Sequence, residues 1–102
     1  MEDWNRVSTL DEIPPLGARI VHTAQGNVGL FRTAEGEVFA LHDKCPHQGG
    51  PLSQGLVAGK RVTCPLHGWN IGLEDGQALA PDKGCAGKVA CKVEEGQVYL
   101  KL

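Results

Sequence analysis

Residues 43–69 read DKCPHQGGPLSQGLVAGKRVTCPLHGW, and this stretch contains two short motifs that pair a cysteine with a histidine. The first is Cys45-Pro46-His47, a Cys-x-His, and the second is Cys64-Pro65-Leu66-His67, a Cys-x-x-His. Sixteen residues, 48–63, separate the two motifs. A proline stiffens each turn, and nearby glycines let the backbone approach a bulky cofactor. A small protein that gives so much length to irregular chain usually has its function there.

On either side of this stretch, short strand-like segments alternate with turn signals. Three turns have the same chemistry, an acidic residue followed by glycine, which supplies the positive φ of tight hairpins. They are Glu35-Gly36, Asp75-Gly76 and Glu95-Gly96. The expected strands cover residues 4–10, 18–24, 27–33, 37–42, 88–93 and 98–102. The pattern predicts an all-β, antiparallel β-sandwich or small barrel, interrupted by a loop-rich subdomain at about residues 43–69.

Length and composition narrow the classes of function. The 102 residues predict a single domain over residues 1–102. A net charge of -2 and 5% aromatic residues argue against a nucleic-acid partner and a polybasic membrane-surface module. No apolar run approaches the ~20 residues that cross a membrane, and no signal-peptide segment follows the acidic start. We therefore expect a cytoplasmic protein, in which the 4 cysteines serve as metal ligands, redox groups or core thiols.

Two thiolates and two imidazoles are compatible with two kinds of metal centre. One is a tetrahedral zinc site, and the other is a two-iron cluster with two Cys on one iron and two His on the other. Structural zinc sites group Cys with Cys and His with His, whereas each motif here supplies one of each. The arrangement favours the two-iron cluster, with zinc or two unrelated Cys-His neighbours as the alternatives.

The motifs CPHQGGPL at residues 45–52 and CPLHGW at residues 64–69 resemble the two ligand boxes of Rieske [2Fe-2S] proteins. The resemblance covers essentially the whole chain. It implies two antiparallel layers, a cluster-binding subdomain and one [2Fe-2S] cluster per chain. It also implies that Cys45 and Cys64 hold the buried inner iron, while His47 and His67 hold the outer iron near solvent.

Softer similarities extend to the small subunit of NAD(P)H-dependent assimilatory nitrite reductase. They lie at residues 11–19, 30–33, 38–41, 50–55 and 82–85. The alternative is the ferredoxin component of a ring-hydroxylating dioxygenase system. A third possibility is a ligand-bearing domain that is mainly structural.

The resemblance implies an electron-transfer subunit of an oxidoreductase, without catalysis of its own. Its partner would be a large reductase subunit with flavin, siroheme and a further iron–sulfur cluster, or another redox protein. The sequence has no Ser/His/Asp set, phosphate-binding glycine loop or dinucleotide fingerprint that would indicate turnover by this chain. We expect the partner to contact the tip that carries the two histidines.

High-potential Rieske proteins have an extra cysteine in each box, joined as a disulfide, and Ser and Tyr hydroxyls that donate to the cluster sulfurs. The matching positions here are Gly50 and Leu66 for the cysteines, and Trp69 and Ile71 for the hydroxyls. With fewer donors to stabilise the added negative charge, the resemblance implies a low reduction potential.

The remaining cysteines and histidines have plainer interpretations. Cys91 lies on the apolar side of an alternating strand and is expected to be a core thiol. Cys85 is expected to be structural, His42 and His22 to be polar strand residues, and Trp69 to shield the cluster and pack the subdomain.

Overall fold

The computed structural model describes residues 4–24, 26–43, 52–64, 68–79, 84 and 86–101. Within these ranges the chain forms β-strands, two single-turn 3-10 helices and no α-helix. The elements are β1 (Trp4–Thr9), η1 (Leu10–Glu12), β2 (Ala18–Thr23), β3 (Gly26–Arg32), β4 (Val38–His42), η2 (Leu52–Gln54), β5 (Leu56–Ala58), β6 (Arg61–Thr63), β7 (Asn70–Gly72), β8 (Lys88–Val89), β9 (Cys91–Glu94) and β10 (Gln97–Lys101).

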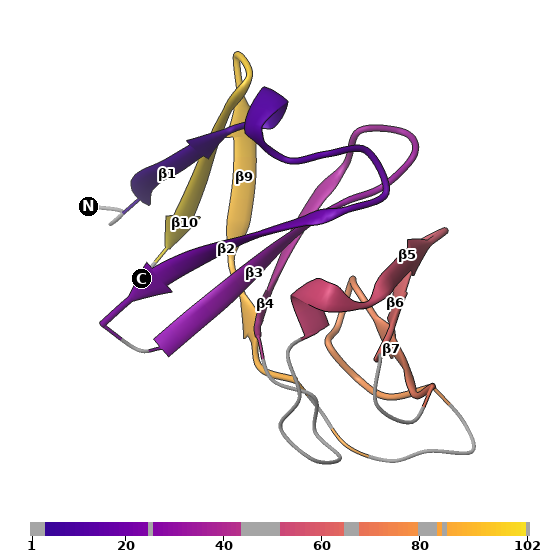
Figure 1. The fold of residues 1–102 in the computed structure, drawn as a ribbon. Helices are drawn as coiled ribbons and strands as arrows, with labels where there is room; N and C mark the ends of the chain where they lie inside the picture. Colours follow the sequence, from indigo (N-terminus) through magenta and orange to yellow (C-terminus); the bar gives the residue numbers. More distant parts are fainter. Residues whose placement is uncertain are drawn as a thin grey trace.

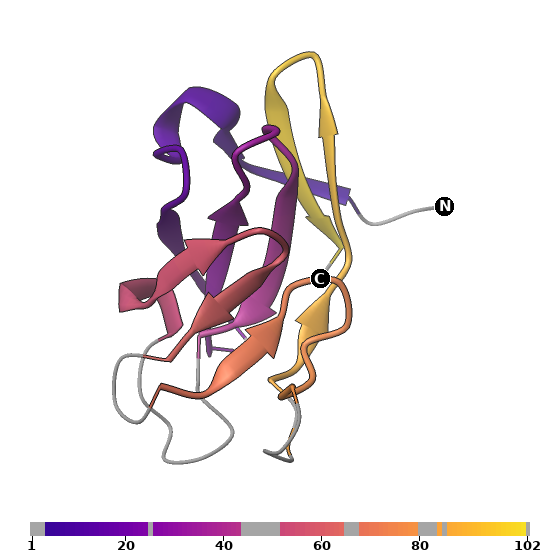
Figure 2. The same ribbon diagram turned by 90° about the vertical axis from the view of Figure 1, so that its right-hand side faces the viewer.

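The strands form three antiparallel sheets (Figure 1). The terminal sheet has the order β1-β10-β9, the four-stranded sheet β2-β3-β4-β8, and the small sheet β5-β6-β7. Figure 2 shows the small sheet in front of the four-stranded sheet, with the terminal sheet behind. The prediction of an all-β, antiparallel fold is confirmed. Among the described residues, no helix is both long and apolar enough to cross a membrane.

The central strand β3 is buried on both faces. Val28 and Leu30 point into the core shared with the terminal sheet, and Phe31 points into the core shared with the small sheet. A strand covered on both sides reads as a continuous apolar run, and β3 has four successive buried residues. At Gly29 a Cβ would come within 2.9 Å of the Phe31 ring, so the glycine makes room for that ring.

Two hydrophobic cores result from this layering. The sandwich core lies between the terminal and four-stranded sheets, and the subdomain core lies between the four-stranded and small sheets. The sandwich core consists of Ile13, Val28, Leu30, Ala40, Val89, Val98 and Leu100. The subdomain core consists of Phe31, Leu41, Leu52, Val57, Val62, Cys64, Ile71, Leu73 and Ala86.

The three acidic-glycine turns occur where they were predicted. Gly36, Gly76 and Gly96 have φ values of 88°, 74° and 76°. Glu95 also has a positive φ, 50°, as expected for a two-residue hairpin turn with both central residues left-handed. The Gly36 and Gly96 turns set the register of the β3–β4 and β9–β10 hairpins, which pair Arg32 with Val38 and Gln97 with Glu94.

Residues 88–93 were predicted as one strand, and this prediction is wrong. The chain forms β8, which pairs with β4, and then β9, which pairs with β10. Ala90 separates the two strands, so the chain passes here from the four-stranded sheet to the terminal sheet. Alternation alone does not reveal such a switch, because the side chains keep their period of two on both sides of it.

The stretch 43–69 contains more regular structure than its composition indicated. β5 and β6 lie within it and β7 follows it. Each of these strands has three residues with a buried central one, namely Val57, Val62 and Ile71. Runs this short carry too little periodicity to be recognised in sequence.

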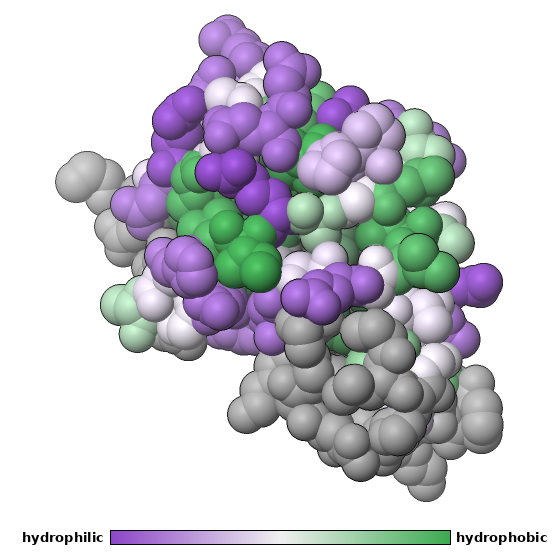
Figure 3. Space-filling view, in the orientation of Figure 1, coloured by the Kyte–Doolittle hydropathy of each residue, from purple (hydrophilic) through white to green (hydrophobic). Residues whose placement is uncertain are grey.

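Figure 3 shows apolar side chains at the surface along β2 and beside β5. The large exposed apolar residues on these two strands are Ile20, 38% exposed, and Leu56, 76% exposed. The surface between them is polar or mixed (Figure 3).

Candidate metal centre

The second cysteine motif begins directly after β6. Cys64 is 2% exposed and belongs to the subdomain core, and its thiol is free. The N–H of Cys64 donates to the carbonyl of Trp69 at 2.6 Å, and the N–H of Gly68 donates to the carbonyl of Cys64 at 3.1 Å. The chain therefore turns back on itself between residues 64 and 69, so the segment carrying His67 is closed at its base.

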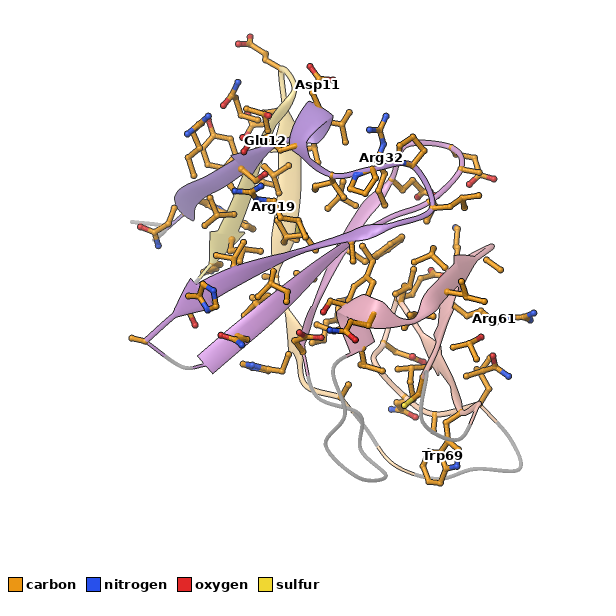
Figure 4. All side chains as sticks on the ribbon, viewed as in Figure 1. Asp11, Glu12, Arg19, Arg32, Arg61 and Trp69 are labelled. Carbon is orange, nitrogen blue, oxygen red and sulfur yellow. The ribbon has the colours of Figure 1, made fainter. Side chains whose placement is uncertain are left out.

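Gly68 and Trp69 complete this turn. Gly68 has φ +73° and no atom within 4 Å of the place its Cβ would occupy, so the backbone conformation, and not crowding, favours glycine here. Trp69 is half-buried against the subdomain core, as the sequence predicted. Figure 4 shows Trp69 at the opposite end of the molecule from Asp11 and Glu12.

The first cysteine motif lies between two fixed points. Asp43 follows β4, and its N–H donates to the carbonyl of Asn27 at 2.9 Å. Leu52 begins η2 and is fully buried in the subdomain core. The carboxylate of Asp43 accepts two hydrogen bonds from Ser53, one from its N–H at 2.7 Å and one from its Oγ at 2.8 Å. The two ends of the first motif's segment are thus held together.

The roots of both segments meet in one place. A Cβ at Gly55 would lie 2.1 Å from the carbonyl oxygen of Thr63, so the chain after η2 runs tightly against the chain that leads into Cys64. Leu52 and Cys64 share the subdomain core. Two separate stretches of sequence are therefore anchored at the same end of the molecule, as a site shared between two loops requires.

Of the four predicted ligands, Cys64 is described by the structure, and Cys45, His47 and His67 lie outside the described residues. Among the residues that are described, no three His, Cys, Asp or Glu side chains gather as a metal site. Cys85, Gly50 and Leu66 also lie outside the described ranges.

The other histidines and cysteines of the described chain agree with their plainer interpretations. His42 ends β4, and its N–H donates to the carbonyl of Gly87 at 2.7 Å. His22 is exposed, with Nδ1 2.7 Å from Oδ1 of Asn27. Cys91 packs against the sandwich core, and burial raises the pKa of its thiol from 9.0 to about 11.

A comparison of the sequence with known families identifies the fold. The sequence profile described as "Rieske [2Fe-2S] domain" matches residues 3–97. The chain belongs to the Rieske [2Fe-2S] family. This Rieske protein accordingly carries one [2Fe-2S] cluster per chain and serves electron transfer.

Curated relatives of this Rieske protein fall into two size classes. The 3-phenylpropionate/cinnamic acid dioxygenase ferredoxin subunit of Photorhabdus laumondii subsp. laumondii is 34% identical over 98 residues, which cover 94% of this chain and 91% of the relative. The vanillate O-demethylase oxygenase subunit of Pseudomonas sp. is 40% identical over 79 residues, 76% of this chain. The chain spans only about a fifth of that oxygenase, 21% of its length.

Solved structures share the fold over nearly the whole chain. A protein of Mycobacterium tuberculosis, provisionally named as the small subunit of an NADH-dependent nitrite reductase, has a TM-score of 0.86 and 24% identity, and the match covers 98% of this chain and 95% of that one. The ferredoxin of carbazole 1,9a-dioxygenase from Nocardioides aromaticivorans has a TM-score of 0.85 and 21% identity, with 95% of each chain covered. At these identities the likeness concerns the fold alone.

The residues of the site fit the cluster in their chemistry. Cys64 offers a buried, unpaired thiol at the root of one segment, and a Rieske cluster takes two thiolate ligands beside two imidazoles. When bound, the cluster accepts and returns one electron without a change in the protein's covalent structure. Sequence reasoning missed Asp43 and Ser53 as supports of the site. The available signal was an acid two residues before Cys45 and a hydroxyl just after Leu52.

Proposed function

We propose that this Rieske protein is the electron-relaying small subunit of an NAD(P)H-dependent nitrite reductase, working in the cytoplasm beside a large subunit with flavin and siroheme. The observation that carries the proposal is the similarity outside the ligand boxes, above all at residues 82–85, DKGC. Dioxygenase ferredoxins do not usually carry a Gly-Cys there. The shared fold is compatible with this role and with the ferredoxin role alike, because proteins of both kinds have it.

The proposed ligand set is Cys45 and Cys64 on the inner iron and His47 and His67 on the outer iron. Three features support it: the spacing of the two motifs, the burial of Cys64, and the common root of the two segments in the subdomain core. Histidine ligands on the outer iron would face the partner, so electrons would enter and leave at this end of the molecule.

The residues near Cys64 would keep water from the inner iron. Cys64 itself, Val62 and Ile71 are at most 2% exposed, and Trp69 packs beside them. A dry surrounding lowers the local dielectric constant and strengthens each charge interaction with the cluster. The chain's own part in the reaction is therefore to hold, orient and shield the cluster, and to present one face of it.

The ferredoxin component of a ring-hydroxylating dioxygenase is the second candidate. It is favoured by a specific observation: a ferredoxin subunit of this kind matches 94% of the chain at 34% identity, with 91% of its own length covered. Both candidates relay single electrons, and they differ in the partner that receives them.

Reconstitution with each partner tests the choice. The purified holoprotein is mixed with the large subunit of an assimilatory nitrite reductase, and complex formation and NAD(P)H-dependent nitrite consumption are measured. We expect a stable complex and a rate that depends on the Rieske protein. Efficient reduction of a ring-hydroxylating oxygenase, with no affinity for the reductase subunit, would instead establish the ferredoxin role.

A cluster-free variant separates relay from scaffold. The variants His67→Ala and Cys64→Ala should lose the two irons, and the nitrite-dependent rate should fall with them. If the iron-free protein still assembles and supports the full rate, the domain is a structural partner and the relay proposal is wrong. The variant Cys91→Ala is the matched control, because it removes a thiol that is not a proposed ligand.

A further inference from the structure

Asp43 joins three parts of the fold at the mouth of the first ligand segment. Its N–H donates to Asn27 at the beginning of β3, and its carboxylate accepts two hydrogen bonds from Ser53 in η2. Each carboxylate oxygen takes one bond, Oδ1 from the N–H and Oδ2 from the hydroxyl. Hydrogen bonds to an ionised acceptor are stronger than those between neutral groups.

The pairing is not an ordinary helix cap. An N-cap side chain belongs to the residue that directly precedes the helix. Asp43 lies ten residues before Ser53 and reaches η2 from the position just after β4. The residues enclosed between them include Cys45 and His47.

The second ligand segment is closed by a different device. There the backbone itself makes the closure, through the hydrogen bonds between Cys64 and Trp69 and between Gly68 and Cys64. The first segment is longer and is closed by side-chain atoms of Asp43 and Ser53. Its closure can therefore be removed by substitution, whereas the closure of the second segment cannot.

We infer that the Asp43–Ser53 bridge is the positioning device of the first ligand segment and sets how tightly the cluster is held. This inference rests on the proposed assignment of Cys45 and His47 as ligands. Two consecutive peptide units place the Cα of Asp43 within about 7 Å of the Cα of Cys45. Without the bridge, the ends of the segment are held only by the backbone bond of Asp43 to Asn27 and by the burial of Leu52. The looser ends would hold the two ligands less firmly and weaken chelation.

Three variants separate the contributions of the two hydrogen bonds and of the Asp43 charge. Asp43→Ala removes both hydrogen bonds, Ser53→Ala removes only the bond to Oδ2, and Asp43→Asn keeps an acceptor for the Ser53 N–H while removing the charge. The measurement is the rate at which the holoprotein releases iron to a chelator, followed by absorbance, together with its thermal unfolding midpoint and the electron paramagnetic resonance line widths of the reduced cluster.

Asp75 supplies the matched control. Its Oδ1 also accepts a backbone N–H, that of Gln77 at 3.0 Å, and it lies in the same subdomain, but it encloses no proposed ligand. Asp75→Ala removes the same residue type and one hydrogen bond from a backbone N–H to a carboxylate, but that bond is local, joining residues two positions apart. Any loss of iron that reflects general loosening of the subdomain appears in this variant as well.

We expect Asp43→Ala to release iron roughly 10-fold faster than the wild type, in line with the effect of losing a supporting contact at a metal site. Ser53→Ala should be intermediate and Asp43→Asn close to wild type, with broadened resonance lines in Asp43→Ala alone. Asp75→Ala should release iron at the wild-type rate. Equal rates for Asp43→Ala and Asp75→Ala, or Asp43→Asn as fast as Asp43→Ala, would overturn the inference.

If Asp43→Ala does not accumulate as folded holoprotein, the iron-release rates of Ser53→Ala and Asp75→Ala are compared instead. Equal rates for these two variants would overturn the inference. The failure of the ligand assignment gives a different result. In that case His47→Ala retains the cluster. Failure of the bridge leaves His47→Ala without a cluster, while the Asp43 and Ser53 variants release iron at wild-type rates.

Discussion

Cys64 and Cys91 are both free thiols, but they lie in different cores of the molecule. Cys64 is fully enclosed at the root of a ligand segment, and Cys91 is half-buried at the edge of the sandwich core. Burial in apolar surroundings disfavours the thiolate, and it raises the pKa of Cys91 to about 11. A thiol kept neutral in this way is a poor nucleophile.

The raised pKa of Cys91 predicts a pH dependence of stability. The thiol titrates near 9.0 when unfolded and near 11 when folded, so the folded state holds the proton more tightly in between. The stabilisation is fully present below about pH 9 and is lost as the pH rises through about 11. Unfolding midpoints of the wild type and Cys91→Ala should therefore converge as the pH is raised from about 8 to about 10.5.

Two outcomes would contradict the predicted convergence of the unfolding midpoints. A constant difference between the two proteins across that range would show that the thiol has its ordinary pKa in the folded state. Rapid alkylation of native Cys91 near neutral pH would lead to the same conclusion. Because both proteins carry the same lysines and tyrosine, the difference isolates the one group.

The resemblance of the ligand boxes implies that Trp69 and Ile71 stand where high-potential Rieske proteins carry hydroxyl donors. Ile71 is fully buried in the subdomain core, and Trp69 packs against that core. Neither residue carries a hydroxyl that could donate to a cluster sulfur. We expect a midpoint in the negative part of the range of roughly −150 to +300 mV that Rieske centres span. Voltammetry at neutral pH measures it, and a midpoint above about +100 mV would contradict this interpretation.

Two substitutions at Trp69 test whether the missing hydroxyl donor is the cause of a low reduction potential. Trp69→Ser introduces a hydroxyl and removes the indole, and Trp69→Ala removes the indole alone. If donors set the potential, the midpoint of Trp69→Ser should lie above that of Trp69→Ala. Equal midpoints would assign any shift to the lost packing and the entry of water.

Among the turns, Gly76 and Gly96 have nearly the same backbone conformation but different surroundings. Their φ values are +74° and +76°. A Cβ at Gly96 would touch nothing within 4 Å, whereas a Cβ at Gly76 would lie 2.2 Å from the carbonyl oxygen of Ala86. The Gly76 turn is thus pressed against the chain that leads into β8.

We predict that Gly96→Ala lowers the free energy of unfolding by about 1 kcal/mol, the cost of a left-handed alanine. Gly76→Ala should lower it by about 3 kcal/mol, because overpacking adds to the same backbone strain. Denaturant unfolding of the two holoproteins measures both values. Equal losses in the free energy of unfolding would mean that the chain at Ala86 moves aside for the new methyl group without further destabilisation.

Much of the element structure follows from the sequence, and the exceptions have physical reasons. Hairpins with glycine at a left-handed position are local, so β3–β4 and β9–β10 were predictable. The switch at Ala90 depends on which strand the chain meets next, and no local signal encodes that. The small sheet was missed because its strands are three residues long, and the Asp43–Ser53 bridge because it joins residues ten positions apart.

The [2Fe-2S] chemistry of the candidate site was predictable from the sequence. The contacts that hold its two segments in place were not. Cysteine and histidine are rare residues whose spacing is informative, so the ligand motifs could be named from sequence. The closure of the 64–69 turn by backbone hydrogen bonds, and the contact of Gly55 with Thr63, involve backbone atoms common to every residue. These features emerge only when the strands are in place.

At the scale of the whole molecule, the two cores differ in their relation to the proposed cluster. The sandwich core contains no proposed ligand, and the subdomain core includes Cys64. Metal binding is coupled to folding where ligands form part of a small core. Removal of the cluster should therefore loosen the small sheet more than the terminal sheet.

Hydrogen exchange of holo and chelated protein checks this prediction. Amides of β5, β6 and β7 should lose protection after cluster removal, while those of β3 and β10 keep most of theirs. Loss of protection throughout all three sheets would show instead that the two cores unfold as one unit.

The pairing of β1 with β10 sets Trp4 directly opposite Lys101, on the side of the molecule away from the small sheet (Figures 1 and 2). Partners across an antiparallel ladder have Cα atoms about 5 Å apart. A short flexible linker can therefore splice Lys101 to Trp4, and new termini can be opened at the exposed Ala34–Glu35 turn. Such a circular permutant should retain its cluster, and it would let the carrier be tethered to a redox enzyme from a different side.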